Sequence, residues 1–461
     1  MVKRFVIAAL MVPALALANG RPPMTNGVYF RPGDDQALYV RSTFGLLVSK
    51  DGGCSFRWVC EKAIGYGGEF DPKYAVASDG TIFATTFEGL RVSRDGGCTW
   101  ATATAERAEN DPGRIANMWI DTIDIASNGD VWVGTASTSK PNDVYRSTDN
   151  GMTFSPAGLS TQTGWWKSVR VAKSDPRRIY ATGYQVAPET GAFLRRSTNG
   201  GASWSELTIP ANVQLGVTPL FLVAAVDPTN PDHLFAIATE ANPPRGDRVY
   251  RSTDGGTTFT EVLATSEPVR DLVFRSSGTV LIATLASGTY ESKPQGAPPF
   301  AKIGEARPNL PDATAPHHGC LAERPNGELV GCGANWQPDY MAVGKATSPL
   351  AWQKLFRFVE LAGPLACAAG TTAATECDPQ WPALSQQFGV TGPPAVCGAS
   401  PDAPPLVDGP PRKSEASGCC ETGSTSPRSA LLAFGVLALL RRGRRASSGS
   451  AASRRAPSSA R

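Results

Sequence analysis

The segment Ser93-Arg94-Asp95-Gly96-Gly97-Cys98-Thr99-Trp100 decides the fold of this 461-residue chain. An Asp side chain can accept hydrogen bonds from nearby backbone N–H groups, and two consecutive glycines supply the positive φ that a tight hairpin needs. The Thr is β-branched and suits a strand, and the Trp offers a large apolar surface to pack against a neighbouring sheet. The segment therefore predicts a self-closing β-hairpin, which we call a box.

Four further segments follow the pattern of this box: Ser49 to Phe56, Ser147 to Phe154, Ser197 to Trp204 and Ser252 to Phe259. The five acidic or Asn positions are Asp51, Asp95, Asp149, Asn199 and Asp254, which lie 44, 54, 50 and 55 residues apart. Two apolar strands, with a turn rich in Asp, Pro and Asn between them, precede the boxes. Such a period predicts one four-stranded β-propeller blade per repeat, because each unit must stack on its neighbours to bury its faces.

Two degenerate copies follow the fifth box. Residues 269–303 keep the order of strands and end on Phe300, but the Asp of the box is missing. Residues 320–355 keep the same order, with Trp352 in the place of the box aromatic. We therefore predict an all-β fold, a seven-bladed β-propeller of four-stranded antiparallel blades over residues 27–357. A six-bladed propeller is the rival prediction.

The boxes resemble those of the BNR/Asp-box propeller superfamily, which includes sialidases, sortilin-type receptor ectodomains, xyloglucan-active glycosidases and photosystem assembly factors. In these families the boxes lie on the rim, away from the central site. The resemblance implies that Asp51, Asp95, Asp149, Asn199 and Asp254 are structural. Because the superfamily contains both enzymes and non-enzymes, the resemblance predicts the fold and leaves the function open.

A ligand site in a propeller usually lies where the innermost strands begin around the central channel. The repeat register places ten candidate residues there: Asp121, Asp124, Trp165, Trp166, Lys167, Arg170, Arg270, Asp271, His317 and His318. Trp side chains with nearby charged groups could stack on a sugar ring and hydrogen-bond its substituents. The alternative is that these residues are ordinary loop aromatics and solvated charges.

The sequence assigns no catalytic residue. A sialidase would begin with Phe-Arg-Ile-Pro, but only Phe30-Arg31-Pro32 is present. Asp121 or Asp124 could pair with Asp271 in a glycosidase, although their spacing in the chain does not fix their separation in space. We expect a non-enzymatic propeller that binds a surface protein or glycan through its channel face. The alternative is a secreted glycoside hydrolase, sialidase-like or otherwise active on carbohydrate.

Composition argues against nucleic acid and metal as ligands. Nine of the 44 basic residues lie near the two termini, which leaves 35 against 41 acidic residues and no basic stripe. The chain has no C-x-x-C pair and only three histidines, so we expect no metal site and no cofactor.

The ten cysteines are interpreted first as disulfides. Cys320 and Cys332 flank a turn at a spacing that suits neighbouring strands, and Cys367 with Cys377 would close a small loop after the propeller. The pairing of Cys54, Cys60, Cys98 and Cys397 stays open.

The N-terminal segment 1–20 predicts a secretory signal peptide, because Lys3 and Arg4 precede the apolar run Phe5 to Leu17 and small residues at cleavage spacing. An exported protein, located at the outer membrane and cell surface or extracellular, is expected.

At the other end, residues 358–418 predict a Cys/Pro-rich spacer. Residues 419–445 combine Cys419 and Cys420, an apolar run from Ala430 to Leu440 and an Arg cluster, and residues 446–461 predict a disordered extension. This arrangement resembles the MYXO-CTERM sorting tail of myxobacterial surface proteins. The resemblance implies cleavage by a sorting protease, a lipid on Cys419 or Cys420, and attachment to the outer membrane. An Arg cluster after the apolar run argues against a GPI signal.

Overall fold

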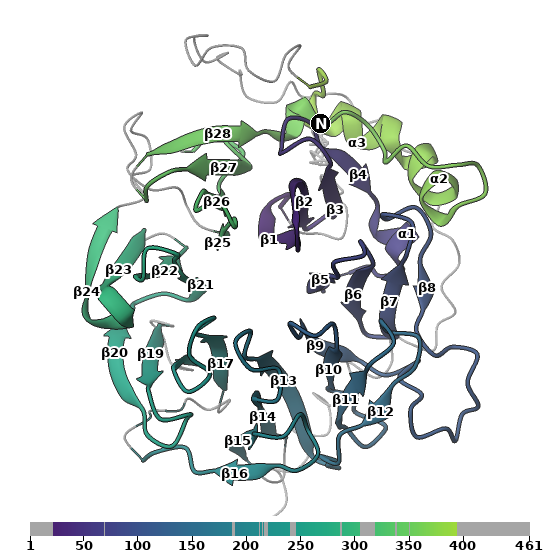
Figure 1. Ribbon diagram of the computed structural model, residues 1–461. Coiled ribbons are helices and arrows are strands. Elements are labelled where there is room, and N and C mark those ends of the chain that lie inside the picture. Colours follow the sequence, from purple (N-terminus) through teal and green to yellow (C-terminus); the bar gives the residue numbers. More distant parts are fainter. Residues whose placement is uncertain are drawn as a thin grey trace, which may run out of the picture. The chain divides into compact units, whose positions relative to one another are not determined.

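Seven groups of four consecutive strands each form an antiparallel sheet, and the sheets stand around a common axis as the blades of a β-propeller (Figure 1). The computed structural model describes residues 22–393 except 69, 187–189, 212, 214, 216–219, 240–245, 286–287, 305–318, 337–338 and 350. The prediction of seven blades is confirmed, and the rival count of six is excluded. A second unit, Asp402–Arg461, lies outside the described residues.

The first four blades are built as follows. Blade 1 contains β1 (Thr25–Arg31), β2 (Asp34–Ser42), β3 (Gly45–Ser49) and β4 (Arg57–Val59), and helix α1 (Glu61–Ile64) follows it. Blade 2 contains β5 (Tyr74–Val76), β6 (Ile82–Thr86), β7 (Gly89–Ser93) and β8 (Ala101–Thr102). Blade 3 contains β9 (Ile120–Ile125), β10 (Val131–Thr135), β11 (Val144–Ser147) and β12 (Ser155–Pro156). Blade 4 contains β13 (Gly164–Val171), β14 (Ile179–Gln185), β15 (Gly191–Ser197) and β16 (Ser205–Leu207).

The last three blades repeat the plan. Blade 5 contains β17 (Phe221–Val226), β18 (Leu234–Thr239), β19 (Asp247–Ser252) and β20 (Thr260–Ala264). Blade 6 contains β21 (Val269–Phe274), β22 (Val280–Thr284), β23 (Thr289–Lys293), the short 3-10 helix η2 (Pro294–Gly296) and β24 (Ala297–Gly304). Blade 7 contains β25 (Cys320–Glu323), β26 (Leu329–Cys332), β27 (Val343–Ala346) and β28 (Trp352–Phe356).

Each box joins the third and fourth strands of its blade, at the end of the ring that we call the box face. In the box of blade 3, Asp149 Oδ1 accepts hydrogen bonds from Thr153 N at 2.9 Å and from Ser147 Oγ at 2.7 Å, and Ser147 Oγ accepts one from Gly151 N at 2.8 Å. The boxes of Asp51, Asp95, Asn199 and Asp254 repeat these bonds. The side chain thus satisfies the backbone of its own turn.

The second glycine of each box also lets neighbouring blades approach closely. Gly201 has φ +83°, and a Cβ built there would lie 2.4 Å from the ring of Trp132 on the preceding blade. Gly296 of blade 6, with φ +65°, stands in the same relation to Phe235 of blade 5, at 2.8 Å. The sixth blade has lost its Asp but has kept this inter-blade contact.

Arginines of one blade hold the box turn of the next. In five pairs of blades a guanidinium group donates to a carbonyl at the tip of the following turn, over 2.8–3.2 Å: Arg94 to Asn150, Arg146 to Gly200, Arg196 to Gly255, Arg251 to Gln295, and Arg324 to Gly52. The last of these bonds crosses from blade 7 to blade 1 and so helps to close the ring. These bonds and the buried apolar side chains between sheets hold the blades together.

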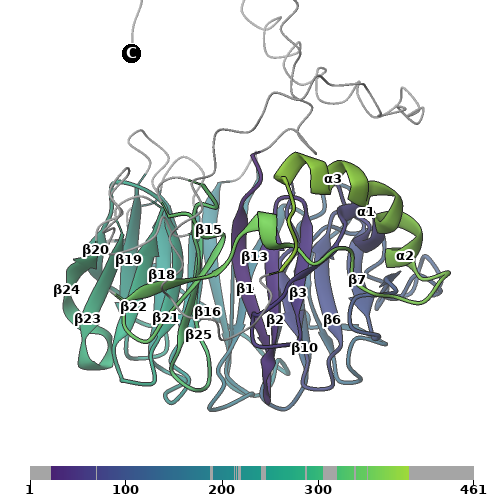
Figure 2. The ribbon, with the colours of Figure 1, turned by 90° about the horizontal axis from the view of Figure 1, so that it is seen from above.

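Residues 358–393 fold against the ring, although the sequence predicted a spacer there. They contain η3 (Phe358–Glu360), α2 (Thr372–Cys377), η4 (Asp378–Gln380) and α3 (Trp381–Phe388). Leu365, Leu384 and Phe388 are buried in the same apolar cluster as Phe44 and Trp58 of blade 1. Figure 2 shows α2 and α3 along the edge of the ring beside blades 1 and 2. We call residues 358–393 the clasp.

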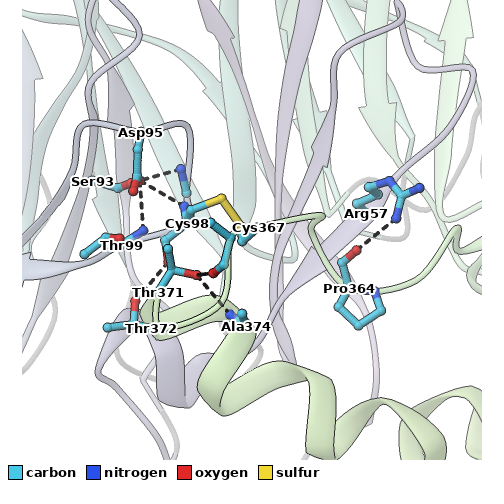
Figure 3. The surroundings of a disulfide bond; sticks show 12 residues. Arg57, Ser93, Asp95, Cys98, Thr99, Pro364, Cys367, Thr371, Thr372 and Ala374 are labelled. Atoms are coloured by element: carbon cyan, nitrogen blue, oxygen red, sulfur yellow. Dashed lines mark hydrogen bonds between the residues drawn. A yellow bond between two sulfur atoms is a disulfide. The ribbon is translucent and has the colours of Figure 1, made fainter.

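The clasp covers the outer edge of blade 1. Its backbone pairs in parallel with β4, since Trp58 N donates to Gly363 O at 2.9 Å and Leu365 N donates to Trp58 O at 2.8 Å. An unpaired outer strand would leave a row of free N–H and C=O groups exposed, so this pairing protects the edge. Figure 3 shows a second attachment, in which Cys98 of the blade 2 box is bonded to Cys367 and Arg57 donates to Pro364 O.

The disulfides confirm one predicted pair and correct the other. Cys320 and Cys332 are bonded between paired positions of β25 and β26, as predicted. Cys367 and Cys377 are not bonded to each other, because helix α2 separates them and each faces a different blade: Cys367 binds Cys98 and Cys377 binds Cys60. Cys54 is disulfide-bonded as well, and Cys397, Cys419 and Cys420 lie outside the described residues.

Within the described part of the chain, no helix is long and apolar enough to cross a membrane. The predicted signal peptide, sorting tail and terminal extension, like residues 394–418 of the predicted spacer, lie outside the described residues.

Candidate active site on the channel face

The innermost strands of five blades carry a β-bulge, and in blades 1, 3, 4 and 6 it occupies the same register position, toward the end of the ring opposite the boxes. We call this end the channel face. The pairing of first and second strands slips by one residue at Asn26, Asp121, Lys167, Ala224 and Arg270. A bulge turns its residue out of the regular alternation of the strand. Four of the five bulged residues are polar or charged, which indicates a polar centre to the ring.

Asp121 gathers two lysines from the neighbouring blades. Its carboxylate forms ion pairs with Lys167 of blade 4 and, at 3.5 Å, with Lys73 of blade 2, whose Nζ also donates to the Asp121 carbonyl at 2.7 Å. The Asp121 side chain is only 5% exposed, whereas that of Lys73 is 41% exposed. Burial, together with the positive charges of Lys167, Arg170 and Arg41, lowers the pKa of Lys73 to about 8.

Two arginines and a second carboxyl lie in the same centre. Arg41 of β2 donates to the side-chain and backbone oxygens of Asn26 at 2.7 and 2.6 Å, and Arg170 donates to Ala224 O at 3.0 Å. Asp271 accepts a hydrogen bond from Leu321 N at 3.0 Å. Burial raises the pKa of Asp271 to about 6, although that hydrogen bond and the charges of Arg41 and Arg170 act in the opposite direction.

A strip of aromatic rings runs beside these charges across blades 2, 3 and 4. The Trp119 ring lies 4.8 Å from Phe87 and 5.4 Å from Trp165, and Phe70 and Tyr184 extend the strip at its two ends. Phe87 is 50% exposed, and Trp119 and Trp165 are half-buried. The Lys167 ammonium lies 5.0 Å from the centre of the Trp119 ring. The aromatic surface on which a sugar ring could stack therefore lies next to a charged group of the polar centre.

The structure brings together five of the ten residues proposed from sequence: Asp121, Trp165, Lys167, Arg170 and Asp271. Trp166 is only 3% exposed and packs in the blade core, because side chains of consecutive strand residues point to opposite faces. Asp124 lies further along β9 and accepts from Val171 N of the next blade at 2.8 Å, so it joins blades. Arg270 is exposed, and His317 and His318 lie outside the described residues.

Four members of the centre were missed by sequence reasoning: Arg41, Lys73, Phe87 and Trp119. Trp119 and Lys73 directly precede the inner strands β9 and β5, so the repeat register contained the signal that would have found them. Arg41 lies on a second strand and Phe87 in a hairpin, and no repeat marks either position.

Two other groups that invite a catalytic interpretation lie elsewhere. Burial raises the pKa of Asp143 to about 6, but this carboxylate accepts from Val144 N and Leu159 N inside blade 3. Arg31, the sialidase-like residue, lies at the far end of β1, where it donates to Ser78 O at 3.0 Å. Among the described residues, no three His, Cys, Asp or Glu side chains are grouped as a metal site would require.

Comparison with known proteins gives one sequence match and a set of similar folds. No family model matches the chain. A xyloglucanase of Hypocrea jecorina (strain QM6a) is 29% identical over 165 residues, which are 33% of this chain and 18% of that protein. An ancestral GH74 enzyme has a similar fold, with a TM-score of 0.52 at 17% identity over 72% of this chain and 46% of its own. The GH74 xyloglucanase of Xanthomonas campestris superimposes with a TM-score of 0.44 at 18% identity, over 71% of this chain and 60% of its own.

The chain thus spans less than half of the curated relative and of the ancestral GH74 enzyme that it matches. The sequence match to a xyloglucanase contradicts the prediction of a non-enzymatic binding propeller. It favours the alternative, a glycoside hydrolase, which was also the enzyme class expected if the chain were catalytic.

Proposed function

We propose that this chain is an exported glycoside hydrolase that acts on a polysaccharide at its channel face. The observation that carries the proposal is the aromatic strip of Phe87, Trp119 and Trp165 beside a polar centre that contains Asp271. The sequence match to a xyloglucanase supports it. The extent of that match leaves the polysaccharide to be identified by experiment.

The strip suits a sugar chain for geometric reasons. Successive rings stand 4.8 and 5.4 Å apart, and they come from three different blades, so the strip crosses blade boundaries. Sugar rings present apolar C–H faces that pack on aromatic rings, while their hydroxyl groups need polar partners at the edge. The polar centre supplies these partners next to the strip.

Asp271 is the described carboxyl that fits a general acid best. Glycosidic bond cleavage needs a carboxylic acid that keeps its proton near neutral pH, which a raised pKa allows. Burial raises the pKa of Asp271 to about 6, and its hydrogen bond to Leu321 N fixes one of its oxygens. Asp121 is enclosed by two lysines, and we assign it to holding them in place.

Hydrolysis of polysaccharides by the full chain tests the proposal. We expect release of reducing ends from xyloglucan or another polysaccharide of a plant cell-wall panel, and a loss of at least about 100-fold in kcat for Asp271→Asn. Asp124→Asn is the matched control, because Asp124 also accepts a backbone hydrogen bond from the next blade. No turnover on any polymer, or equal losses in the two variants, would contradict the proposed activity.

We also propose that the chain belongs to the Asp-box propellers, and that it is exported and held at the outer membrane through Cys419 or Cys420 after processing of its tail. The disulfides Cys60–Cys377 and Cys98–Cys367 support export, because such bonds persist in oxidising compartments. The double variant Cys419→Ala with Cys420→Ala should appear in the medium or keep its tail. Unchanged attachment to the membrane fraction would argue against the anchor.

A further inference from the structure

The polar centre contains more positive than negative charge. Lys73 and Lys167 share a single carboxylate, that of Asp121. The Asp121 side chain is 5% exposed, while those of Lys73 and Lys167 are 41% and 19% exposed. A molecule that approaches the channel face can therefore reach the two ammonium groups, whereas the carboxylate that balances them is covered.

The two arginines add to this excess. Arg41 donates to the oxygens of Asn26, and Arg170 donates to the carbonyls of Ala224 and Val169, so these hydrogen bonds go to neutral acceptors. Asp271 is the carboxyl that interacts electrostatically with both guanidinium groups, and burial raises its pKa to about 6. Four cations thus lie with the carboxyls of Asp121 and Asp271, of which Asp271 is partly protonated near neutral pH, and with Asp71, which accepts from Asn26 Nδ2 at 2.7 Å.

The cations lie where a stacked sugar would present its substituents. Lys167 Nζ is 5.0 Å from the centre of the Trp119 ring, and Trp119 is the middle ring of the strip. Lys167 covers this face of Trp119, so a sugar ring packed on the exposed neighbouring ring of Phe87 would lie beside the Lys167 ammonium group. Charge-assisted hydrogen bonds between ammonium groups and carboxylates are stronger than those to neutral hydroxyls.

We propose that Lys73 and Lys167 form a subsite for a carboxylated sugar, so that the substrate is an acidic polysaccharide. This inference rests on the proposed hydrolase function and narrows its substrate class. The buried Asp121 offsets only one of the two ammonium charges, and the carboxylate of the sugar supplies the negative charge that the centre lacks.

Two cellulose derivatives with the same backbone test the subsite: carboxymethyl-cellulose, which is anionic, and hydroxyethyl-cellulose, which is neutral. In affinity electrophoresis of the full chain at low salt, we expect the anionic polymer to be bound at least about 10-fold more tightly, and the difference to disappear in 0.5 M NaCl. Lys167→Met should abolish the difference. Lys173→Met is the matched control, because Lys173 lies at the other end of β13 beside Asp124 and should leave the difference unchanged.

Asp121→Asn provides a second variant that keeps both lysines and removes their partner. It should tighten binding of the anionic polymer by about 3-fold or more and leave the neutral polymer unaffected, even if Lys167→Met does not fold. Equal binding of both polymers, binding of neither, or weaker binding of the anionic polymer by Asp121→Asn would overturn the subsite. Hydrolysis of the whole plant cell-wall panel, neutral and acidic polymers alike, measured in parallel reports separately on the proposed activity.

Discussion

The two ends of the propeller are built on opposite plans. On the box face, five turns repeat one set of hydrogen bonds around Asp51, Asp95, Asp149, Asn199 and Asp254. On the channel face, the equivalent bulge positions of blades 1, 3, 4 and 6 hold Asn26, Asp121, Lys167 and Arg270, and no two of these residues are the same.

This difference separates the residues that build the ring from those that give it a function. A turn that must close itself and fit the next blade has the same physical requirements in every blade, so its sequence repeats. A site at the centre needs a different group from each blade, because a ligand presents different atoms to each of them. In this protein, the residues that recur from blade to blade therefore have structural roles, and the positions that differ between blades form the candidate site.

The largest expected effect contrasts two tryptophans, one from each end. Trp119→Ala should lower kcat/KM of the folded protein for the polysaccharide by about 30-fold, which corresponds to about 2 kcal/mol, besides the loss of stability that follows from removing a half-buried ring. Trp204→Ala removes a box aromatic that packs against Trp132 and donates to Ala157 O, and should lower stability by about 2 kcal/mol without changing kcat of the folded protein. Kinetics and thermal melts measure both variants. An unchanged kcat/KM in folded Trp119→Ala, or a fall in kcat of folded Trp204→Ala, would contradict the contrast.

Removal of one box carboxylate tests whether the box face is structural. Asp149→Ala should lower the free energy of unfolding by about 2 kcal/mol, because the hydrogen bonds from Met152 N, Thr153 N and Ser147 Oγ are lost together. Denaturant unfolding measures the loss. Asp175→Ala serves as a control, since the partly exposed Asp175 carboxylate accepts from one backbone group, Arg177 N, and from the side chain of the same residue. A large fall in kcat of folded Asp149→Ala would contradict a purely structural box.

The pH dependence of turnover sharpens the assignment of the channel face. Burial raises the pKa of Asp271 to about 6, so the fraction that carries a proton falls as the pH rises through that value. If Asp271 is the general acid, kcat should fall about tenfold per pH unit above this pKa. A plot of kcat against pH measures this fall. The residual activity of Asp271→Asn should not show it. If kcat instead rises between pH 6 and 8, a residue other than Asp271 must be the general acid.

The smallest effect is expected within the box face. Asn199→Asp makes the fourth box match the other four, and should change stability by less than about 0.5 kcal/mol at pH 7. The reason is that Asn199 Oδ1 already accepts from Ser203 N at 2.9 Å and from Ser197 Oγ at 3.0 Å, as the carboxylates do in the other boxes. Thermal melts of the purified variant and of the unchanged protein measure this difference in stability. A change above about 2 kcal/mol would show that the boxes are not equivalent.

The ring could be predicted from sequence because its determinants are local and repeated. Each box carries its own turn chemistry, and the degenerate copies at Phe300 and Trp352 were recognised from their place in the period. The site could be predicted only in part. The register located Asp121, Lys167 and Asp271, but it did not distinguish Trp165 from Trp166, whose side chains point in opposite directions from one strand.

Long-range contacts were beyond this reasoning. Cys60 and Cys98 lie in blades 1 and 2, while their partners lie 317 and 269 residues later. The short spacing of Cys367 and Cys377 favours a bond between them. Spacing alone cannot show that helix α2 turns Cys377 toward another blade. The clasp folds through contacts with residues far away in the sequence, namely its packing on Phe44 and Trp58, its pairing with β4 and its two disulfides.

The clasp sets an order of events during synthesis. Cys60 and Cys98 leave the ribosome long before Cys377 and Cys367 exist, and at about 5 to 20 residues per second the interval of 317 residues lasts roughly 15 to 60 s. Throughout that time Cys60 and Cys98 lack their native partners, and together with Cys54 of the same two blades they can form other disulfides. The first blades to be made are thus the last to be fixed by these disulfides to the C-terminal part of the chain.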